Sequence, residues 1–252
     1  MGSRFQNYSE GALSSHDQVA RALGTDILAG VYPPGTKIPG EAEILERFGI
    51  SRTVLREVLK TLTAKGLIVS KTRVGTKVLD EVHWNMFDSD VLAWKVAGGF
   101  DEGFRRDLAE IRLAIEPEAA AMAARRATTE QIEMLRERLE DMRNATASRR
   151  AFAEADLAFH QAIGTVSGNA LMRGISGVIE TALMASFTLS SAVDDKAEHK
   201  KNVGHHQAIV DAIEARDADR ARGAMRATID YGVARIRRVT AKGNGAWLNN
   251  SD

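Results

Sequence analysis

Three polar residues lie on the apolar faces of two segments whose residue spacing predicts helices. Asp156 and His160 fall on the inward side of the segment 150–166, one helical turn apart, so both side chains can converge on one point. His206 lies among the apolar residues of the later segment 200–215. A buried charge is costly unless it is paired or bound to metal, and two imidazoles with a carboxylate suit Zn²⁺, Ni²⁺ or Mn²⁺. An internal Asp–His pair without metal explains the same pattern, and both alternatives stay open at this point.

An arginine lies on the apolar face of a third predicted helix. Arg112 falls in line with apolar residues at helical spacing in the segment 102–126. An inward guanidinium suits a carboxylate ligand, because its parallel N–H groups match the two carboxylate oxygens. Arg112, Asp156, His160 and His206 are therefore the candidate residues for binding a small carboxylate ligand.

The same polar residues could serve a different class of protein, a metal-assisted hydrolase or isomerase that acts on a hydroxy acid. The sequence shows no nucleophile elbow, phosphate-binding loop or second general-base motif, and an enzyme would leave the basic N-terminal part unexplained. The chain also has no cysteine, which excludes disulfides, thiolate zinc sites, iron–sulfur clusters and a cysteine nucleophile. We therefore expect a protein that is not an enzyme.

Positive charge gathers near the N-terminus, although the chain as a whole has 34 basic and 34 acidic residues. Residues 52–77 include seven Lys or Arg and a single acid, Glu57. Arg52 and Arg56 are four residues apart and share one face of a predicted helix. Guanidinium forks at a helix start match guanine edges in the major groove, and nearby hydroxyl and backbone N–H groups suit phosphates. A basic stretch with this local pattern indicates a DNA-binding surface, although Arg56 could instead pair with Glu57 or Glu43 on the surface.

The elements around this stretch predict a winged helix-turn-helix over residues 16–80. Apolar spacing predicts helices over 17–29, 41–48 and 51–65, separated by glycine-containing turns. Strand-like pieces follow at 67–71 and 76–79, and the loop between them would be the wing. The candidate DNA-binding residues are Ser51, Arg52, Thr53 and Arg56 on the third helix, and Lys71, Thr72 and Arg73 on the wing.

The rest of the chain reads as an all-helical domain over residues 90–240, so the fold class is mainly α. A linker is expected at 81–89, and flexible ends at 1–15 and 241–252. No apolar run approaches the roughly 18–20 residues needed to span a bilayer, and no secretory signal precedes the first helix. A cytoplasmic protein without membrane contact is expected. The expected helices are 90–96, 102–126, 130–144, 150–166, 170–190, 200–215 and 218–239, with Thr129 and Asn169 as N-caps.

The N-terminal pattern resembles the GntR family of bacterial repressors. The resemblance is carried by YPPGTKIP at Tyr32–Pro39, EAEIL at Glu41–Leu45, GISRTVLREVL at Gly49–Leu59 and GLI at Gly66–Ile68. It covers the whole predicted winged-helix domain and implies a DNA-binding regulator. Many members carry an Arg at the position of Ala42 that touches DNA, so this chain departs from the family there.

The C-terminal part resembles the ligand-binding domain, called FCD, of the FadR-type branch of this family. The Asp-x-x-x-His motif matches Asp156 and His160, a His-x-x-Ile-x-x-Ala-Ile motif begins at His206, and an early helix carries Arg112. The resemblance implies that this Arg faces an effector and that the Asp and His residues can ligate a metal. Metal-binding members have a third His in the last helix, where this chain has Thr228.

With threonine at this position, a metal-bound site and a metal-free site both stay open. The expected metal ligands are Asp156, His160 and His206, and water, the effector, Thr228 or His205 would have to complete the coordination sphere. A divalent ion such as Zn²⁺, Ni²⁺ or Mn²⁺ is the expected cofactor if one binds.

The segment Trp84–Trp94 is similar to the linker of family members that repress sugar-acid catabolism, which implies an aldonate such as galactonate or gluconate as effector. The chain is therefore expected to be a repressor that binds near-palindromic operator DNA as a homodimer. A small carboxylate would release it by favouring the arrangement that does not bind DNA. The alternative is a metal-responsive regulator, in which the ion itself is the signal.

Overall fold

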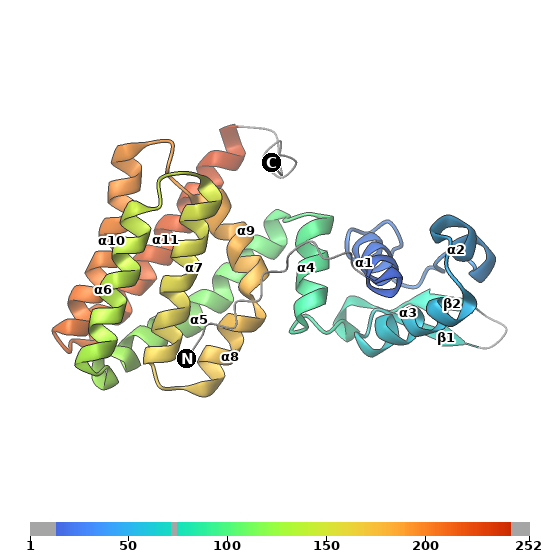
Figure 1. Cartoon of the computed structure of the whole chain (residues 1–252), viewed down its shortest axis with the longest axis horizontal. Coiled ribbons are helices and arrows are strands. Elements are labelled where there is room, and N and C mark those ends of the chain that lie inside the picture. The colour runs from blue at the N-terminus through green and yellow to red at the C-terminus, as the bar shows by residue number, and fades with distance from the viewer. Residues whose placement is uncertain (1–13, 72–74, 243–252) are drawn as a thin grey trace. The chain divides into compact units, whose positions relative to one another are not determined.

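The computed structural model describes residues 14–71 and 75–242 and divides into two compact units between Gly99 and Phe100 (Figure 1). The predicted fold class is confirmed, because the described residues are mostly helical and contain one small sheet of two strands. Each unit has its own hydrophobic core. The units are therefore described separately.

The first unit is a winged helix-turn-helix, as predicted. Gly49 ends the second helix in the left-handed conformation that favours glycine, and Ser51 caps the third helix by accepting a hydrogen bond from the backbone N–H of Val54. The two strands pair antiparallel, with Ile68 opposite Val78. The elements are α1 (Ser15–Leu28), α2 (Glu41–Phe48), α3 (Arg52–Ala64), β1 (Ile68–Lys71), β2 (Gly75–Val78) and a 3-10 turn, η1 (Glu81–His83).

One further helix, α4 (Ser89–Gly98), belongs to this unit, although the sequence analysis placed it at the start of the second domain. Its Trp94 ring lies directly on α1, where a Cβ added to Gly24 would come within 2.1 Å of the ring. The Lys65 ammonium group, at the end of α3, contacts the carboxylates of Asp88 and Asp90 at 2.7 and 2.8 Å. A small residue facing a large one, with an ion pair beside them, fixes α4 to the winged-helix fold.

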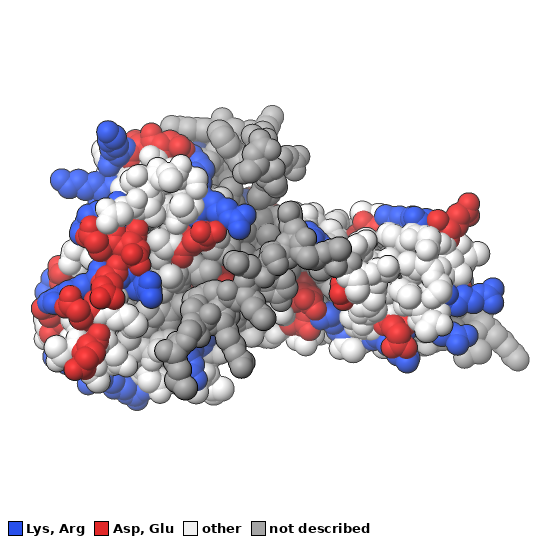
Figure 2. Space-filling view, viewed as in Figure 1, with Lys and Arg blue, Asp and Glu red and all other residues white. Residues whose placement is uncertain are grey.

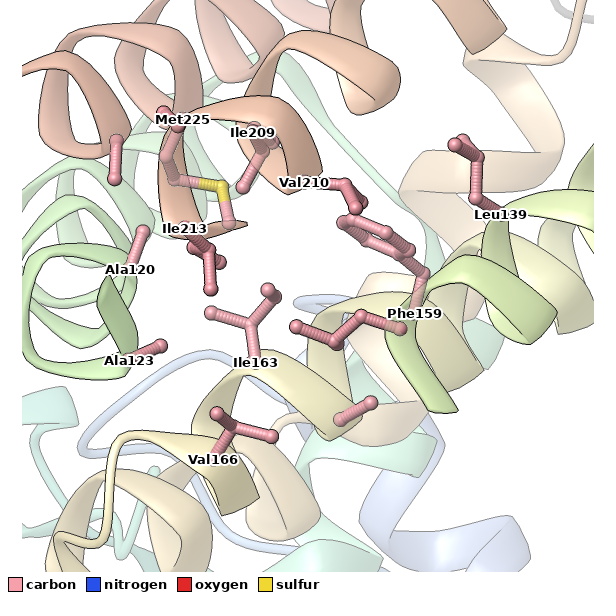
Figure 3. Packing of buried hydrophobic residues seen from close by; sticks show 14 of the residues in the cluster. Ala120, Ala123, Leu139, Phe159, Ile163, Val166, Ile209, Val210, Ile213 and Met225 are labelled. Carbon is pink, nitrogen blue, oxygen red and sulfur yellow. The ribbon is translucent and has the colours of Figure 1, made fainter. Parts of the chain in front are cut away.

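The described part of the second unit is a bundle of seven helices, in which α5, α6, α7, α10 and α11 run alongside one another (Figure 1). Its core joins small side chains of α5, such as Ala120 and Ala123, to large ones of α7 and α10, such as Phe159 and Ile213 (Figure 3). Pairing small with large side chains lets neighbouring helices approach and fill the interior. The helices are α5 (Glu102–Arg126), α6 (Thr129–Asn144), α7 (Arg149–Val166), α8 (Ala170–Val178), α9 (Glu180–Ser190), α10 (Lys196–Glu214) and α11 (Ala218–Lys242).

The prediction of one continuous helix over 170–190 is wrong. The helix is interrupted at Ile179, and the chain turns by 67° between α8 and α9. No residue of α8 is buried, whereas α9 buries Leu183 and Phe187 in the bundle, so the bend directs the second half into the core. Among the described residues, no single helix is long and apolar enough to cross a membrane; only the bent pair α8 and α9 reaches that length and hydropathy together.

Two helix starts also differ from the expectation. The N-cap of α6 is Thr128, not Thr129, and it forms a capping box with Gln131. The start of α10 lies about one turn earlier than expected, because the Asp195 side chain accepts hydrogen bonds from the backbone N–H groups of Ala197 and Glu198. The cap predicted at Asn169 is present on α8.

Candidate functional site

The three residues predicted as metal ligands meet in the interior of the second unit. Asp156 and His160 project from α7, and His206 projects from α10. Oδ1 of Asp156 lies 3.3 Å from Nε2 of His160 and 3.1 Å from Nε2 of His206. All three side chains are buried, and one potential ligand atom from each lies within 4.8 Å of the others. The structure thus brings together residues that are 50 positions apart in the sequence.

Glu116 of α5 completes this cluster, and the sequence analysis assigned it no role. Its Oε2 lies 2.5 Å from Nδ1 of His160, an ion-pair contact whose angle does not fit a hydrogen bond. Its Oε1 accepts a hydrogen bond of 2.7 Å from Nε of Arg112, one turn earlier on the same helix. The four-residue spacing between Arg112 and Glu116 was the available signal, since both residues then share one helix face.

Opposite charges hold this cluster in its ionised form. Burial alone would raise the pKa of Glu116, but Arg112 and His160 outweigh burial and lower it to about 2. Burial alone would lower the pKa of His160, but Glu116 and Asp156 raise it to about 9. Burial likewise opposes ionisation of Asp156, yet His206 and His160 hold its pKa well below the usual range. The result is a buried chain of alternating positive and negative groups.

The groups that face the Nδ1 atoms of His206 and His160 determine which nitrogen of each imidazole carries a proton. Nδ1 of His206 lies 2.9 Å from the backbone oxygen of Asn202, which can only accept, so Nδ1 carries a proton. Nδ1 of His160 lies 2.5 Å from the Glu116 carboxylate, and only a proton on Nδ1 makes so close a contact attractive. Both Nε2 atoms then point at one oxygen of Asp156. Such a convergence needs either two fully protonated imidazoles or a cation at the shared point, so the donor set fits a divalent metal ion.

Thr228 of α11 lines the same small cavity, but its hydroxyl group is committed elsewhere. Its Oγ1 donates to the backbone oxygen of Ala224 at 2.9 Å, and the backbone oxygen of His205 lies at 3.4 Å. The free volume at the polar centre is about 10 Å³, which is room for one water molecule or ion. Arg112 also borders a second, larger cavity of about 510 Å³.

The predicted DNA-binding residues of α3 are all exposed. Arg52 reaches across to Glu41 of α2, with 3.1 Å between Nε and Oε1, and both side chains are more than half exposed. Glu57 pairs with Lys60, and Arg56 forms no ion pair with any residue that the structure describes. The alternative in which Arg56 pairs with Glu57 or Glu43 is therefore absent from the described contacts.

Three other predicted positions cannot be placed in the same way. Thr72 and Arg73 of the wing lie outside the described residues, as does the side chain of Lys71.

Ala42 is exposed on α2, so this chain presents a methyl group where many members of the family that it resembles present an arginine. On the face shown in Figure 2, Lys and Arg side chains alternate with Asp and Glu over the second unit and form no continuous basic field there.

Comparison with known proteins agrees with both units. The profile of the bacterial regulatory proteins of the gntR family matches residues 15–78, and the profile of the FCD domain matches residues 107–231. The galactonate operon transcriptional repressor of Escherichia coli K12 is 33% identical over 228 residues, which cover 90% of this chain and 99% of that protein. This chain belongs to the GntR family. It is a transcriptional regulator of the GntR type with an FCD domain, not an enzyme.

Other relatives of this GntR-family protein agree with that assignment. The Uxu operon transcriptional regulator of Escherichia coli K12 is 30% identical over 83% of this chain and 82% of its own length. A solved structure of Lar from Listeria monocytogenes matches with a TM-score of 0.57 at 18% identity, covering 88% of this chain and 96% of that one. The structural match concerns the fold alone.

Proposed function

We propose that this GntR-family protein represses an operon for the catabolism of a sugar acid, and that a small carboxylate bound in its FCD domain releases it from DNA. The observation that carries the proposal is the buried cluster of Arg112, Glu116, His160, Asp156 and His206, a charged centre that a folded domain does not need for its stability. The relative named as the repressor of the galactonate operon favours an aldonate, such as galactonate or gluconate, as effector.

DNA binding is assigned to the exposed start of α3. Arg56 has no competing partner among the described residues, so its guanidinium is available to a base edge. Arg52 must leave Glu41 to reach DNA, and an exposed pair of this kind is easily exchanged for a phosphate or base. Ser51 and Thr53 lie beside them and suit phosphate contacts. Lys71, Thr72 and Arg73 of the wing would contact the phosphate backbone of the DNA. Two subunits would present two such helices to a near-palindromic operator.

A metal ion is assigned to Asp156, His160 and His206; it would displace the proton on Nε2 of His160, and Glu116 would orient that ring through Nδ1. A bound divalent cation would supply positive charge for a carboxylate or hydroxyl oxygen of the effector. Thr228 takes the place of a third imidazole and leaves part of the coordination sphere to water or effector. Arg112 holds Glu116 in place and offers its remaining N–H groups to the acid.

A metal-responsive regulator is the second candidate function. It is favoured by the small free volume of about 10 Å³ at the polar centre, which accommodates an ion but not a sugar acid. In that case operator affinity would follow the concentration of free metal and would ignore carboxylates.

The DNA assignment is tested by fluorescence anisotropy with DNA from upstream of the protein's own gene and with random DNA, over a salt series. We expect affinity for the upstream DNA to exceed that for random DNA by about a thousandfold or more, and both to weaken as salt rises. Arg56→Ala should lose about ten- to hundredfold in specific affinity. The matched control is Lys60→Ala on the same helix, which should change affinity by less than about threefold. Equal binding of upstream and random DNA by the wild type would overturn the assignment.

The effector assignment is tested by thermal shift with galactonate and gluconate, each with and without a chelator. A ligand that binds only the folded state raises the melting temperature, so an aldonate should stabilise the wild type and release it from upstream DNA. Chelation should remove the shift if the ion takes part in binding. The variant His160→Gln, checked for folding by circular dichroism, should lose the chelator-sensitive part. Stabilisation by metal alone, with no response to acids, would favour the metal-responsive alternative.

A further inference from the structure

The larger cavity of the second unit lies beside the buried cluster of Asp156, His160 and His206 and shares only Arg112 with the lining of that polar centre. It has a volume of about 510 Å³ and is bounded by α5, α9 and α11. The polar centre itself leaves only about 10 Å³, so any organic ligand that reaches Arg112 must occupy mainly the larger cavity. Arg112 lines both spaces and is the point where they meet.

Arg112 is a partly unsatisfied donor at this point. The residue is 5% exposed, its Nε is bonded to Glu116, and its guanidinium lies 4.7 Å from the Phe187 ring centre. Its two terminal amino groups donate no hydrogen bond to any described residue. Ser186, 7% exposed on α9, lines the larger cavity, and its hydroxyl also forms no hydrogen bond within the described part of the chain. Neither the Arg112 amino groups nor the Ser186 hydroxyl is among the buried polar atoms that lack a partner, so these groups face the open space of the cavity and are available to a ligand.

The far end of the larger cavity is basic as well. Arg105, Arg106 and Arg237 line it, and Glu102 is the only acid among the described residues that do so. Arg106 pairs with Asp107 and Glu110. Within the described ranges, the Arg105 side chain donates only to the neutral backbone oxygen of Phe100, so its charge stays available.

Arg237 likewise forms no ion pair with a described residue. Arg105 and Arg112 are seven residues apart on α5, which places them on one helix face about 10 Å apart along the axis. Leu108 and Ala109 lie between them and line the cavity.

We propose that the larger cavity binds an acid with anionic groups at both ends of a short carbon chain. One carboxylate is held by Arg112 and Ser186, and the second anionic group, a carboxylate or a phosphate, is held by Arg105 and Arg237. This proposal rests on the proposed function, since it specifies the effector class of the same domain. Arginine suits both ends, because its planar fork binds carboxylate and phosphate in a bidentate manner.

The test compares three ligands with one carbon skeleton: gluconate, glucarate and 6-phosphogluconate, which carry a hydroxyl, a carboxylate and a phosphate at carbon 6. Dissociation constants are measured by calorimetry on the full-length protein. We expect glucarate or 6-phosphogluconate to bind at least tenfold more tightly than gluconate. Whichever of these two ligands binds more tightly identifies the second anionic group as a carboxylate or a phosphate. Inorganic phosphate at the same concentration should bind far more weakly than either, because it cannot reach both ends.

Variants separate the two ends of the cavity. Arg237→Gln and Arg105→Gln should remove most of the advantage of the doubly charged ligand and leave gluconate binding within about twofold. The matched control is Arg238→Gln, an exposed neighbour that faces Glu198 at 3.9 Å and does not line the cavity. This variant should leave the dissociation constants of both kinds of ligand unchanged. Circular dichroism confirms that each variant is folded.

Two outcomes would overturn the proposal. If gluconate binds and releases the protein from DNA while neither doubly charged acid binds more tightly, the inference fails and the proposed function stands. If none of the three acids binds, while the protein still prefers its upstream DNA, the doubly charged ligand and the carboxylate effector fail together, and the metal-responsive alternative takes their place.

Discussion

The two units of the protein present their functional residues in opposite ways. The DNA-binding candidates Arg52 and Arg56 lie on one exposed helix turn, and a single helix is enough to place them. The candidate effector residues are buried, and three helices, α5, α7 and α10, are needed to bring Glu116, His160 and His206 together. A groove of DNA approaches a surface, whereas a small ligand must be enclosed, so only the second kind of site depends on tertiary packing.

The charged clusters of the two units also differ in exposure: the first lies partly in solvent and the second is buried. In the first unit the ammonium group of Lys65 contacts Asp88 and Asp90 next to Trp94, and the Asp90 side chain is 61% exposed. In the second unit no member of the ion-pair chain is more than slightly exposed. Exposure lets water compensate for a lost partner, so the first cluster should tolerate substitution and the second should not.

The largest effect is expected from Glu116→Ala. This variant leaves the buried cations Arg112 and His160 without their shared partner, and it should lower the free energy of unfolding of the second unit by about 3–5 kcal/mol. Urea unfolding followed by circular dichroism measures the change. Glu116→Gln keeps the size and should cost less. A loss below 1 kcal/mol for the alanine variant would show that the cluster does not behave as a coupled buried network.

A smaller effect is expected where α4 meets α1. Gly24→Ala places a methyl group where the Trp94 ring lies, so it should cost about 1–3 kcal/mol through displacement of α4. Thermal unfolding followed by circular dichroism measures the loss, since the fluorescence of Trp94 overlaps with that of Trp84 and Trp247. Gly40→Ser is the control, because nothing lies within 4 Å of an added Cβ and serine is a good helix cap. If both variants had the same stability, the packing of Trp94 on α1 would not hold α4 against the winged-helix core.

The ion pair of the first unit predicts a modest pH dependence. Burial raises the pKa of Asp88, but Lys65 and two backbone N–H groups outweigh burial and hold it below its ordinary value of 3.8. The folded pKa is thus lower than the unfolded one, so the stabilisation is present above about pH 4 and is lost as the pH falls further. Asp88→Asn keeps the helix cap and should cost about 0.5–1 kcal/mol at pH 7. The difference from wild type should vanish near pH 2; a constant difference would contradict the charge explanation.

The smallest effect is expected at the surface pair between α2 and α3. Glu41→Gln releases Arg52, so specific DNA affinity should rise by about two- to threefold at low salt and by less at high salt. Anisotropy titrations over a salt series measure this change. Glu43→Gln on the same helix, which no described ion pair involves, is the control for the removal of a negative charge. Identical gains in both variants would mean that long-range repulsion, not the Arg52 pair, limits binding.

Much of the first unit could be predicted because its signals are local. The glycine at position 49 and the serine at position 51 mark a turn and a cap, and apolar spacing places Leu55, Val58 and Leu62 in the core. The division after α4 could not be predicted in the same way, because it depends on Gly24 and Trp94, which are 70 residues apart. The break at Ile179 was missed since α8 and α9 are both apolar helices in sequence, and only the core decides which of them turns inward.

The sequence by itself determined the secondary structure of most segments, the face of α3 that carries Arg52 and Arg56, and the residues Asp156, His160 and His206 as a candidate set. These follow from the period of the helix and from the types of side chain, which are properties of short segments. Only the tertiary structure decided that Glu116 joins the set, that Arg112 lies between a closed polar centre and a larger basic cavity, and that α4 belongs with the first unit. Helix faces are set locally, but which faces meet depends on how side chains of different size fill a common interior.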